Sequence, residues 1–199
     1  MNEIVLASGN KGKIDEVRDL LEGYEIKLLT LEDFPEIGEI TEDGKSLQEN
    51  AMLKAHSCFQ LTGVASLADD TGLEVYALDM HPGIYTARYS GPEADSDKNV
   101  KKLLENMKDL KSDEERRARF RSVLALYDGY EEHVFEGICE GRISPEPKGS
   151  NGFGYDPVFI PDGHTKTFGE MTPFQKNMIS HRSIALGHFQ EFLETSDLF

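Results

Sequence analysis

The segment ADDTG, residues 68–72, places two adjacent carboxylates directly after an apolar run. Carboxylate oxygens suit Mg²⁺, and either carboxylate could activate a water molecule. Side chains alternate along a strand, so Asp69 and Asp70 would point to opposite sides, and only one of them would reach a reacting centre. Because Asp and Gly also form turns, a solvated turn is the alternative reading of the same letters.

A short polar segment, SGNKGK at residues 8–13, joins an apolar run to a helical pattern. It is not a Walker A motif, because its glycines are too close together and Ile14 stands where that motif has Ser or Thr. Free amide groups at a helix N-terminus, together with Lys11 and Lys13, still favour a bound phosphate. The alternative is an ordinary strand–helix turn capped by Asn10.

Asn50 and Lys54 lie four residues apart in ENAMLKA, residues 49–55, and so share one face of a helix. The lysine could reach a phosphate if that face meets the SGNKGK loop. The alternative is the exposed polar face of an ordinary helix.

Two segments nearer the C-terminus could contact a planar ligand. In GSNGFGYDP, residues 149–157, Phe153 stands between two glycines and Tyr155 follows the second, and both rings could stack on a base, although the glycine spacing is not a dinucleotide fingerprint. A flexible loop is the alternative. In KNMISHRS, residues 176–183, His and Arg side chains offer hydrogen-bond donors, unless they form a plain surface pair. No histidine spacing typical of a metal site occurs in the chain.

Length and charge limit the classes of function. The 199 residues are enough for one domain with a substantial core. A net charge of −16 argues against nucleic acid polymers and anionic membranes as partners, because both require a basic face. No apolar run approaches the roughly 18 residues that span a bilayer, and the N-terminus lacks a signal-peptide pattern, so we expect a cytoplasmic protein. Cys58 and Cys139 are expected to be buried, reduced thiols.

Hydrophobic periodicity and turn residues predict the elements that position these segments. In the N-terminal half we expect strands over 2–7 and 25–30 with a helix between them, a helix over 46–62 opened by a capping box of Ser46 and Glu49, and strands over 64–67 and 73–78 with ADDTG as a polar hinge. In the C-terminal half we expect a helix over about 96–110, a hairpin of 119–127 and 133–144, and a final helix that starts at Thr172 and Pro173. No linker separates them, so we expect one domain over residues 1–199.

Together these segments resemble the nucleoside-triphosphate pyrophosphatases of the HAM1/RdgB type, also called inosine triphosphatases or XTP/dITP diphosphatases. The resemblance runs in order from about residue 4 to residue 190, through SGNKGK, ENAMLKA, ADDTGLEV with PGIYTARYSG, GFGYDPVF and SHR. It implies an α/β fold with a long mixed β-sheet flanked by helices, and two lobes with an active-site cleft between them. It also implies a homodimer, for which the helix at 100–107 and PGIYTARYSG are candidate contacts.

The implied reaction is hydrolysis of a small-molecule substrate, a non-standard purine nucleoside triphosphate (ITP, dITP or XTP), between its α and β phosphates. The products are a nucleoside monophosphate and pyrophosphate, and the role is to cleanse the nucleotide pool. Two alternatives stay open: a Maf-type relative that acts on pyrimidine or methylated nucleotides, and a protein that binds nucleotides without turnover.

The resemblance also implies residue roles. Asp70 is the catalytic base and a Mg²⁺ ligand, and Glu42 is the further metal ligand, with Asp43 as its near rival. Lys54 reaches toward the phosphates, and Thr71 contacts the substrate through its hydroxyl. The phosphates are held by Ser8, Gly9, Asn10, Lys11, Gly12 and Lys13, and the base by Phe153, Gly154, Tyr155, Asp156, Lys176, His181 and Arg182.

Base choice has a physical interpretation. Donors from His181 and Arg182 can bond a 6-keto oxygen, whereas the 6-amino group of ATP would leave those donors unpaired, at roughly 1–3 kcal/mol each.

Overall fold

The computed structural model describes residues 2–38, 40 and 42–196 of the chain. Contacts within the backbone divide it into two compact units. The first unit comprises Met1–Asp70, Ser122–Glu136 and Ile184–Phe199, and the second comprises Thr71–Arg121 and Gly137–Ser183. The expectation of one domain over 1–199, and of a cleft between two lobes, stays a prediction.

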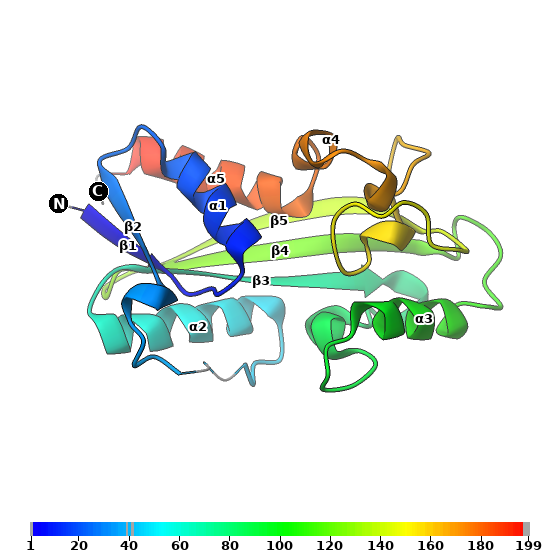
Figure 1. The fold of residues 1–199 in the computed structure, drawn as a ribbon, viewed down its shortest axis with the longest axis horizontal. Coiled ribbons are helices and arrows are strands. Elements are labelled where there is room, and N and C mark those ends of the chain that lie inside the picture. Colours follow the sequence, from blue (N-terminus) through cyan, green and yellow to red (C-terminus); the bar gives the residue numbers. More distant parts are fainter. Residues whose placement is uncertain (1, 39, 41, 197–199) are drawn as a thin grey trace. The chain divides into compact units, whose positions relative to one another are not determined.

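A mixed β-sheet forms the framework, as the resemblance implies (Figure 1). Its six described strands run in the order β2-β1-β3-β4-β5-β6. Strand β1 is parallel to β2 and to β3, whereas β5 is antiparallel to β6. The strands are β1 (Asn2–Leu6), β2 (Ile26–Thr30), β3 (Ser66–Val75), β4 (Arg117–Tyr127), β5 (Glu132–Ile143) and β6 (Phe159–Pro161).

In the first unit, helices cover both faces of the sheet (Figure 1). Helices α1 (Lys11–Leu21) and α5 (His181–Thr195) bury Val17 and Phe189 against Ile4 and other side chains of one face. Helix α2 (Leu47–Thr62) lies on the opposite face. Because neighbouring strand residues point to opposite faces, the sheet presents different side chains to α1 and to α2.

Local signals in the sequence explain where α2 begins and ends. Ser46 Oγ accepts the Glu49 N–H at 3.1 Å, which is the predicted N-cap. The predicted capping box forms only half, because the Glu49 carboxylate accepts the N–H of Lys45 instead of that of Ser46. Gly63 ends the helix with a left-handed φ of 66°, a conformation that glycine adopts without strain.

The second unit has its own hydrophobic core. Helix α3 (Ser96–Asn106) contributes Val100 and Leu103 to this core, and Met107 joins it just after the helix. The apolar side of the helix over 100–107 is therefore covered by its own unit, and the expectation that this helix contacts a second copy of the chain stays a prediction. The helix is also shorter than the predicted 96–110, because Met107 already acts as its C-cap.

Two predicted boundaries are wrong. Strand β3 runs without a break through ADDTG, because pairing with neighbouring strands outweighs the turn preference of Asp and Gly. The predicted final helix is two helices, α4 (Pro173–Asn177) and α5. Thr172 caps the first, and Ser180 Oγ accepts the N–H of Ser183 to start the second.

Cys58 and Cys139 are buried and free, as predicted. Among the described residues, no helix has both the length and the apolar character that a membrane crossing requires.

Candidate active site

The two carboxylates of ADDTG point in opposite directions, as strand alternation predicts. Asp69 Oδ2 lies 2.7 Å from Lys13 Nζ, which comes from α1 on one face of the sheet. Asp70 Oδ2 accepts a hydrogen bond of 3.1 Å from Asn50 Nδ2, which comes from α2 on the other face. The strand therefore gives each acid a different set of partners.

Lys54 joins the acidic groups on the α2 side. Its Nζ lies 2.9 Å from Glu42 Oε1 and 3.7 Å from Asp70 Oδ1, and it donates to the carbonyl oxygen of Asp69. Burial lowers the pKa of Lys54, but the carboxylates of Asp70, Asp69 and Glu42 outweigh burial, so that the pKa lies above its ordinary value. The ammonium is thus held in its charged form.

Asp70 is a stronger base than an ordinary aspartate. Burial raises its pKa, the Lys54 ammonium opposes that rise, and Glu42 adds to it, so that the pKa is raised overall. A carboxylate with a raised pKa accepts a proton more readily, which suits a catalytic base, and this role of Asp70 stays a prediction.

The residues on the α2 side have the donor types that Mg²⁺ favours. No group of three or more His, Cys, Asp or Glu side chains among the described residues is arranged to hold a metal ion. Magnesium is typically bound by one or two carboxylates together with substrate phosphates. Glu42 and Asp70 could supply the two carboxylates of such a site. Of the two rival ligands, Glu42 contacts Lys54 whereas Asp43 is exposed.

The SGNKGK segment forms the turn between β1 and α1. Asn10 Oδ1 accepts the N–H of Lys13 at 3.3 Å, and the N–H of Asn10 donates to Ser8 Oγ at 3.2 Å. The cap predicted at Asn10 is therefore present. It starts the helix that carries Lys13 to Asp69, and a phosphate site in the same turn stays a prediction.

A second group of predicted site residues lies in the second unit, around Asp156. This buried carboxylate accepts from Lys176 Nζ at 2.6 Å and from the N–H of Phe153 at 2.8 Å. The Phe153 ring is 60% exposed, with Lys176 Nζ 4.7 Å and Arg182 Cζ 5.9 Å from its centroid. Gly152 has a left-handed φ of 75°, and a Cβ there would overlap Asp156 Oδ2. Only glycine fits that position.

The remaining predicted base-pocket residues differ in exposure. Tyr155 is only 3% exposed, and its hydroxyl donates to the carbonyl oxygen of Thr86, so the expectation that its ring stacks on a base is wrong. The preceding Gly154, with a positive φ of 60°, lets the chain turn inward at this point, and the Tyr155 ring joins the core. His181 is buried and stacks on Phe120 with ring centroids 4.7 Å apart. Thr71 follows Asp70 within β3.

Asn50 and Asp69 are polar residues whose part in the site the sequence left open. The predicted polar face of ENAMLKA is not solvated at Asn50, which is fully buried. The shared helical face of Asn50 and Lys54 was the available signal, since both side chains reach Asp70.

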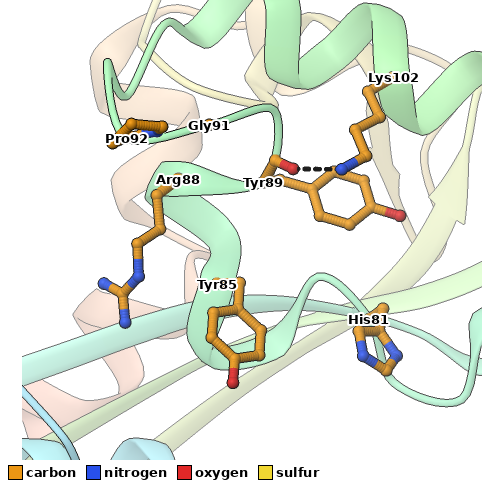
Figure 2. A pocket seen from close by; sticks show the side chains of 7 residues that line it. All are labelled: His81, Tyr85, Arg88, Tyr89, Gly91, Pro92 and Lys102. Carbon is orange, nitrogen blue, oxygen red and sulfur yellow. Dashed lines mark hydrogen bonds between the residues drawn. The ribbon is translucent and has the colours of Figure 1, made fainter.

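A separate pocket of about 460 Å³ lies in the second unit (Figure 2). Lys102 Nζ donates to the carbonyl oxygen of Tyr89 at 2.6 Å, and Arg88 lies 5.5 Å from the ring centroid of Tyr85. The lining residues are His81, Tyr85, Arg88, Tyr89, Gly91, Pro92 and Lys102. None of them is a residue predicted for the site.

Comparisons with known proteins agree over almost the whole chain. The model of the Ham1 family matches residues 4–192. A dITP/XTP pyrophosphatase from Porphyromonas gingivalis is 45% identical over 193 residues, which cover 97% of this chain and 98% of that protein. A protein of the same name from Oceanobacillus iheyensis is 42% identical over 197 residues, which cover 98% and 100%. The solved structure of a HAM1 protein from Coxiella burnetii matches with a TM-score of 0.93 and 40% identity, covering 98% of this chain and 100% of that one.

Proposed function

The chain belongs to the Ham1 family, and from this premise we propose that it hydrolyses non-canonical purine nucleoside triphosphates to a nucleoside monophosphate and pyrophosphate. Its relatives are named dITP/XTP pyrophosphatases, and ITP carries the same 6-keto base as dITP. Such an enzyme removes these nucleotides from the pool before a polymerase can use them.

The observation that carries the proposal is the half-buried set of Glu42, Lys54 and Asp70. One ammonium lies between two carboxylates, and the pKa of Asp70 is raised by burial. In-line attack on a phosphate needs a positioned water, a group that accepts its proton, and positive charge near the phosphate oxygens. Asp70 accepts the proton from water, and Lys54 turns from the carboxylates to the phosphates.

The metal proposed here is Mg²⁺, with Asp70 and Glu42 as its protein ligands. When bound, it would neutralise charge on the phosphates. Lys13 supplies a further positive charge, since α1 directs its ammonium toward Asp69. The turn of residues 8–13 presents its amide groups to the phosphates at the N-terminus of α1.

The base is held by residues of the second unit. The exposed ring of Phe153 provides a stacking surface, and Asp156 fixes Lys176 beside it. Lys176, His181 and Arg182 supply donors for the 6-keto oxygen. A 6-amino group would leave such donors unpaired, which costs roughly 1–3 kcal/mol each and disfavours ATP.

We further propose a cytoplasmic homodimer. Its contact is the stretch PGIYTARYSG, residues 82–91, in which the Tyr85 side chain is 47% exposed. The observation that supports this stretch is a large aromatic side chain left in contact with solvent, since such residues are enriched at interfaces.

Replacement of the base tests the proposal. Asp70→Asn keeps the shape of the side chain but cannot accept the proton, so pyrophosphate release from ITP should fall at least about 10²-fold. Binding of a non-hydrolysable ITP analogue should persist. Asp15→Asn is the matched control, because Asp15 is exposed and pairs only with Arg18 among the described residues. Undiminished turnover by Asp70→Asn would remove Asp70 from its role as the base.

A further inference from the structure

The Asn50 carboxamide connects two chain segments that carry the proposed metal ligands. Its Oδ1 accepts the N–H of Gly44 at 2.9 Å, and its Nδ2 donates to Asp70 Oδ2 at 3.1 Å. Gly44 follows Glu42 by two residues. One side chain of α2 therefore contacts both the segment of Glu42 and the carboxylate of Asp70.

The surroundings of Asn50 require an amide. The side chain is 0% exposed, so water does not replace a lost hydrogen bond without a change in packing. A carboxamide offers one acceptor and one donor group, which match the Gly44 N–H and the Asp70 carboxylate respectively. Gly44 permits this close approach, because a Cβ there would lie 2.6 Å from Asn50 Oδ1.

The two oxygens of Asp70 have different surroundings. Oδ2 is occupied by Asn50, and Oδ1 lies 3.7 Å from Lys54 Nζ, outside normal hydrogen-bond distance. A hydrogen bond to one carboxylate oxygen fixes the plane of the group and hence the direction of the other. Oδ1 is thus the oxygen left for the water or the metal.

We infer that Asn50 is a positioning residue for the reaction: it directs Asp70 Oδ1 toward the reacting centre and, through Gly44, sets the position of the Glu42 segment. This inference rests on the proposed function, in which Asp70 is the base and a metal ligand. Groups that orient metal ligands typically change activity or metal affinity by 10- to 100-fold when replaced.

Two substitutions separate the two contacts. Asn50→Asp has nearly the same shape and keeps an acceptor for Gly44, but it places a second carboxyl group about 3 Å from Asp70 in place of the amide donor. Two carboxylates at that distance share one proton, so Asp70 is no longer held as a free base by a neutral donor. Asn50→Asp should lower kcat for ITP by about 10- to 100-fold while the KM for ITP changes less than threefold. Asn50→Leu loses both contacts, so it should lower kcat similarly and also raise the Mg²⁺ concentration for half-maximal rate about tenfold.

Asn99 provides the matched control. It is also a buried helical asparagine, 3% exposed, which accepts the N–H of Ser90 at 2.6 Å and donates to the carbonyl of Ala87 at 2.8 Å. Asn99→Leu should lower Tm as much as Asn50→Leu does, yet leave kcat and the Mg²⁺ requirement of the folded enzyme within about twofold of the parent.

The outcomes separate this inference from the proposed function. If Asn50→Asp retains the parent kcat while Asp70→Asn is inactive, Asn50 is only structural and the inference is overturned alone. Equal losses in kcat for Asn50→Leu and Asn99→Leu, measured per folded molecule, would overturn it as well. If Asp70→Asn itself retains turnover, the proposed base is wrong and the inference falls with it.

Discussion

The ionised side chain of Asp70 has a cost in stability, whatever chemistry it performs. Its pKa is raised by burial although an ammonium lies nearby, which means that folding favours the protonated carboxyl. At neutral pH the ionised form is therefore less favourable in the folded protein than in the unfolded chain.

This leads to a prediction on stability. Asp70→Asn replaces the carboxylate by a neutral group, so it should raise Tm at pH 7. The gain should shrink as the pH falls through the raised pKa toward the ordinary value of 3.8, because Asp70 itself then becomes neutral. Thermal unfolding of both proteins from pH 7 to pH 4 measures this, and a variant that is less stable than the parent at pH 7 would contradict it.

The absence of a side chain at Gly152 leaves room for the Asp156 carboxylate. Gly152→Ala should displace Asp156 and with it Lys176, because the added Cβ overlaps Asp156 Oδ2. We expect the KM for ITP to rise about tenfold, equivalent to about 1.4 kcal/mol of binding. Steady-state kinetics measure this change.

Gly163→Ala is the control for that substitution. Gly163 has nearly the same φ, 77° against 75°, but nothing lies within 4 Å of an added Cβ. Both variants therefore share the backbone strain, and only Gly152→Ala has the overlap. Equal KM values for the two variants would count against Asp156 as the support of the base site.

The sequence predicted residue types at the site better than their burial. Alternation along β3 correctly sends Asp69 and Asp70 to different partners, since the period of a strand is independent of the surrounding fold. The burial of Asn50 and Tyr155 was not predictable from spacing alone. It depends on which faces of α2 and of the 149–157 loop meet the core, and these contacts are made by residues distant in the sequence.

Helices and strands were predicted where local signals and packing agree. Helix α2 begins after an N-cap serine and ends at a glycine with a left-handed backbone conformation, and the sequence predicted both ends. The ADDTG segment has turn-forming residues but lies between paired strands, so non-local pairing decides its conformation. The break between α4 and α5 was not predicted. Ser180 is a residue type that caps helices, and its hydroxyl does accept the N–H of Ser183 at the start of α5.

Arg116 is the side chain on which the end of α3 depends. Its buried guanidinium donates to four main-chain carbonyls, those of Met107, Leu110, Ile143 and Ser144. A lysine ammonium cannot reach all four, because its donors radiate from one atom. Arg116→Lys should therefore lower the free energy of unfolding by about 2–4 kcal/mol.

The neighbouring arginine provides the comparison. Arg117 forms partly exposed ion pairs with Asp162 and Glu140, so Arg117→Lys should cost about 0–1 kcal/mol. Urea unfolding of both variants measures the difference. Similar losses would mean that the four buried hydrogen bonds do not hold the end of α3.

The protein as a whole carries a net charge of −16, yet its proposed substrate is a polyanion. Binding is possible because the positive charges are local: Lys13 and Lys54 are paired with carboxylates before the substrate arrives. The same excess of acid disfavours long nucleic acids, which need an extended basic face.

Association of two copies can be tested through Tyr85, which lines the pocket of Figure 2. If the proposed dimer forms, Tyr85→Glu adds a charge to its contact and should convert it to a monomer in sedimentation velocity. Tyr130→Glu, at a 94% exposed turn position, is the control and should leave the dimer unchanged. A Tyr85→Glu protein that still sediments as the parent dimer would exclude this stretch as the contact.

The central claim is metal-dependent cleavage of non-canonical purine nucleoside triphosphates, and pyrophosphate release tests it most directly. ITP, XTP, GTP, ATP and dTTP would each be assayed with and without Mg²⁺. We predict rapid, Mg²⁺-dependent pyrophosphate release from ITP and XTP and little from the others. Preference for a pyrimidine triphosphate, release of orthophosphate instead of pyrophosphate, or nucleotide binding without any release would contradict the account.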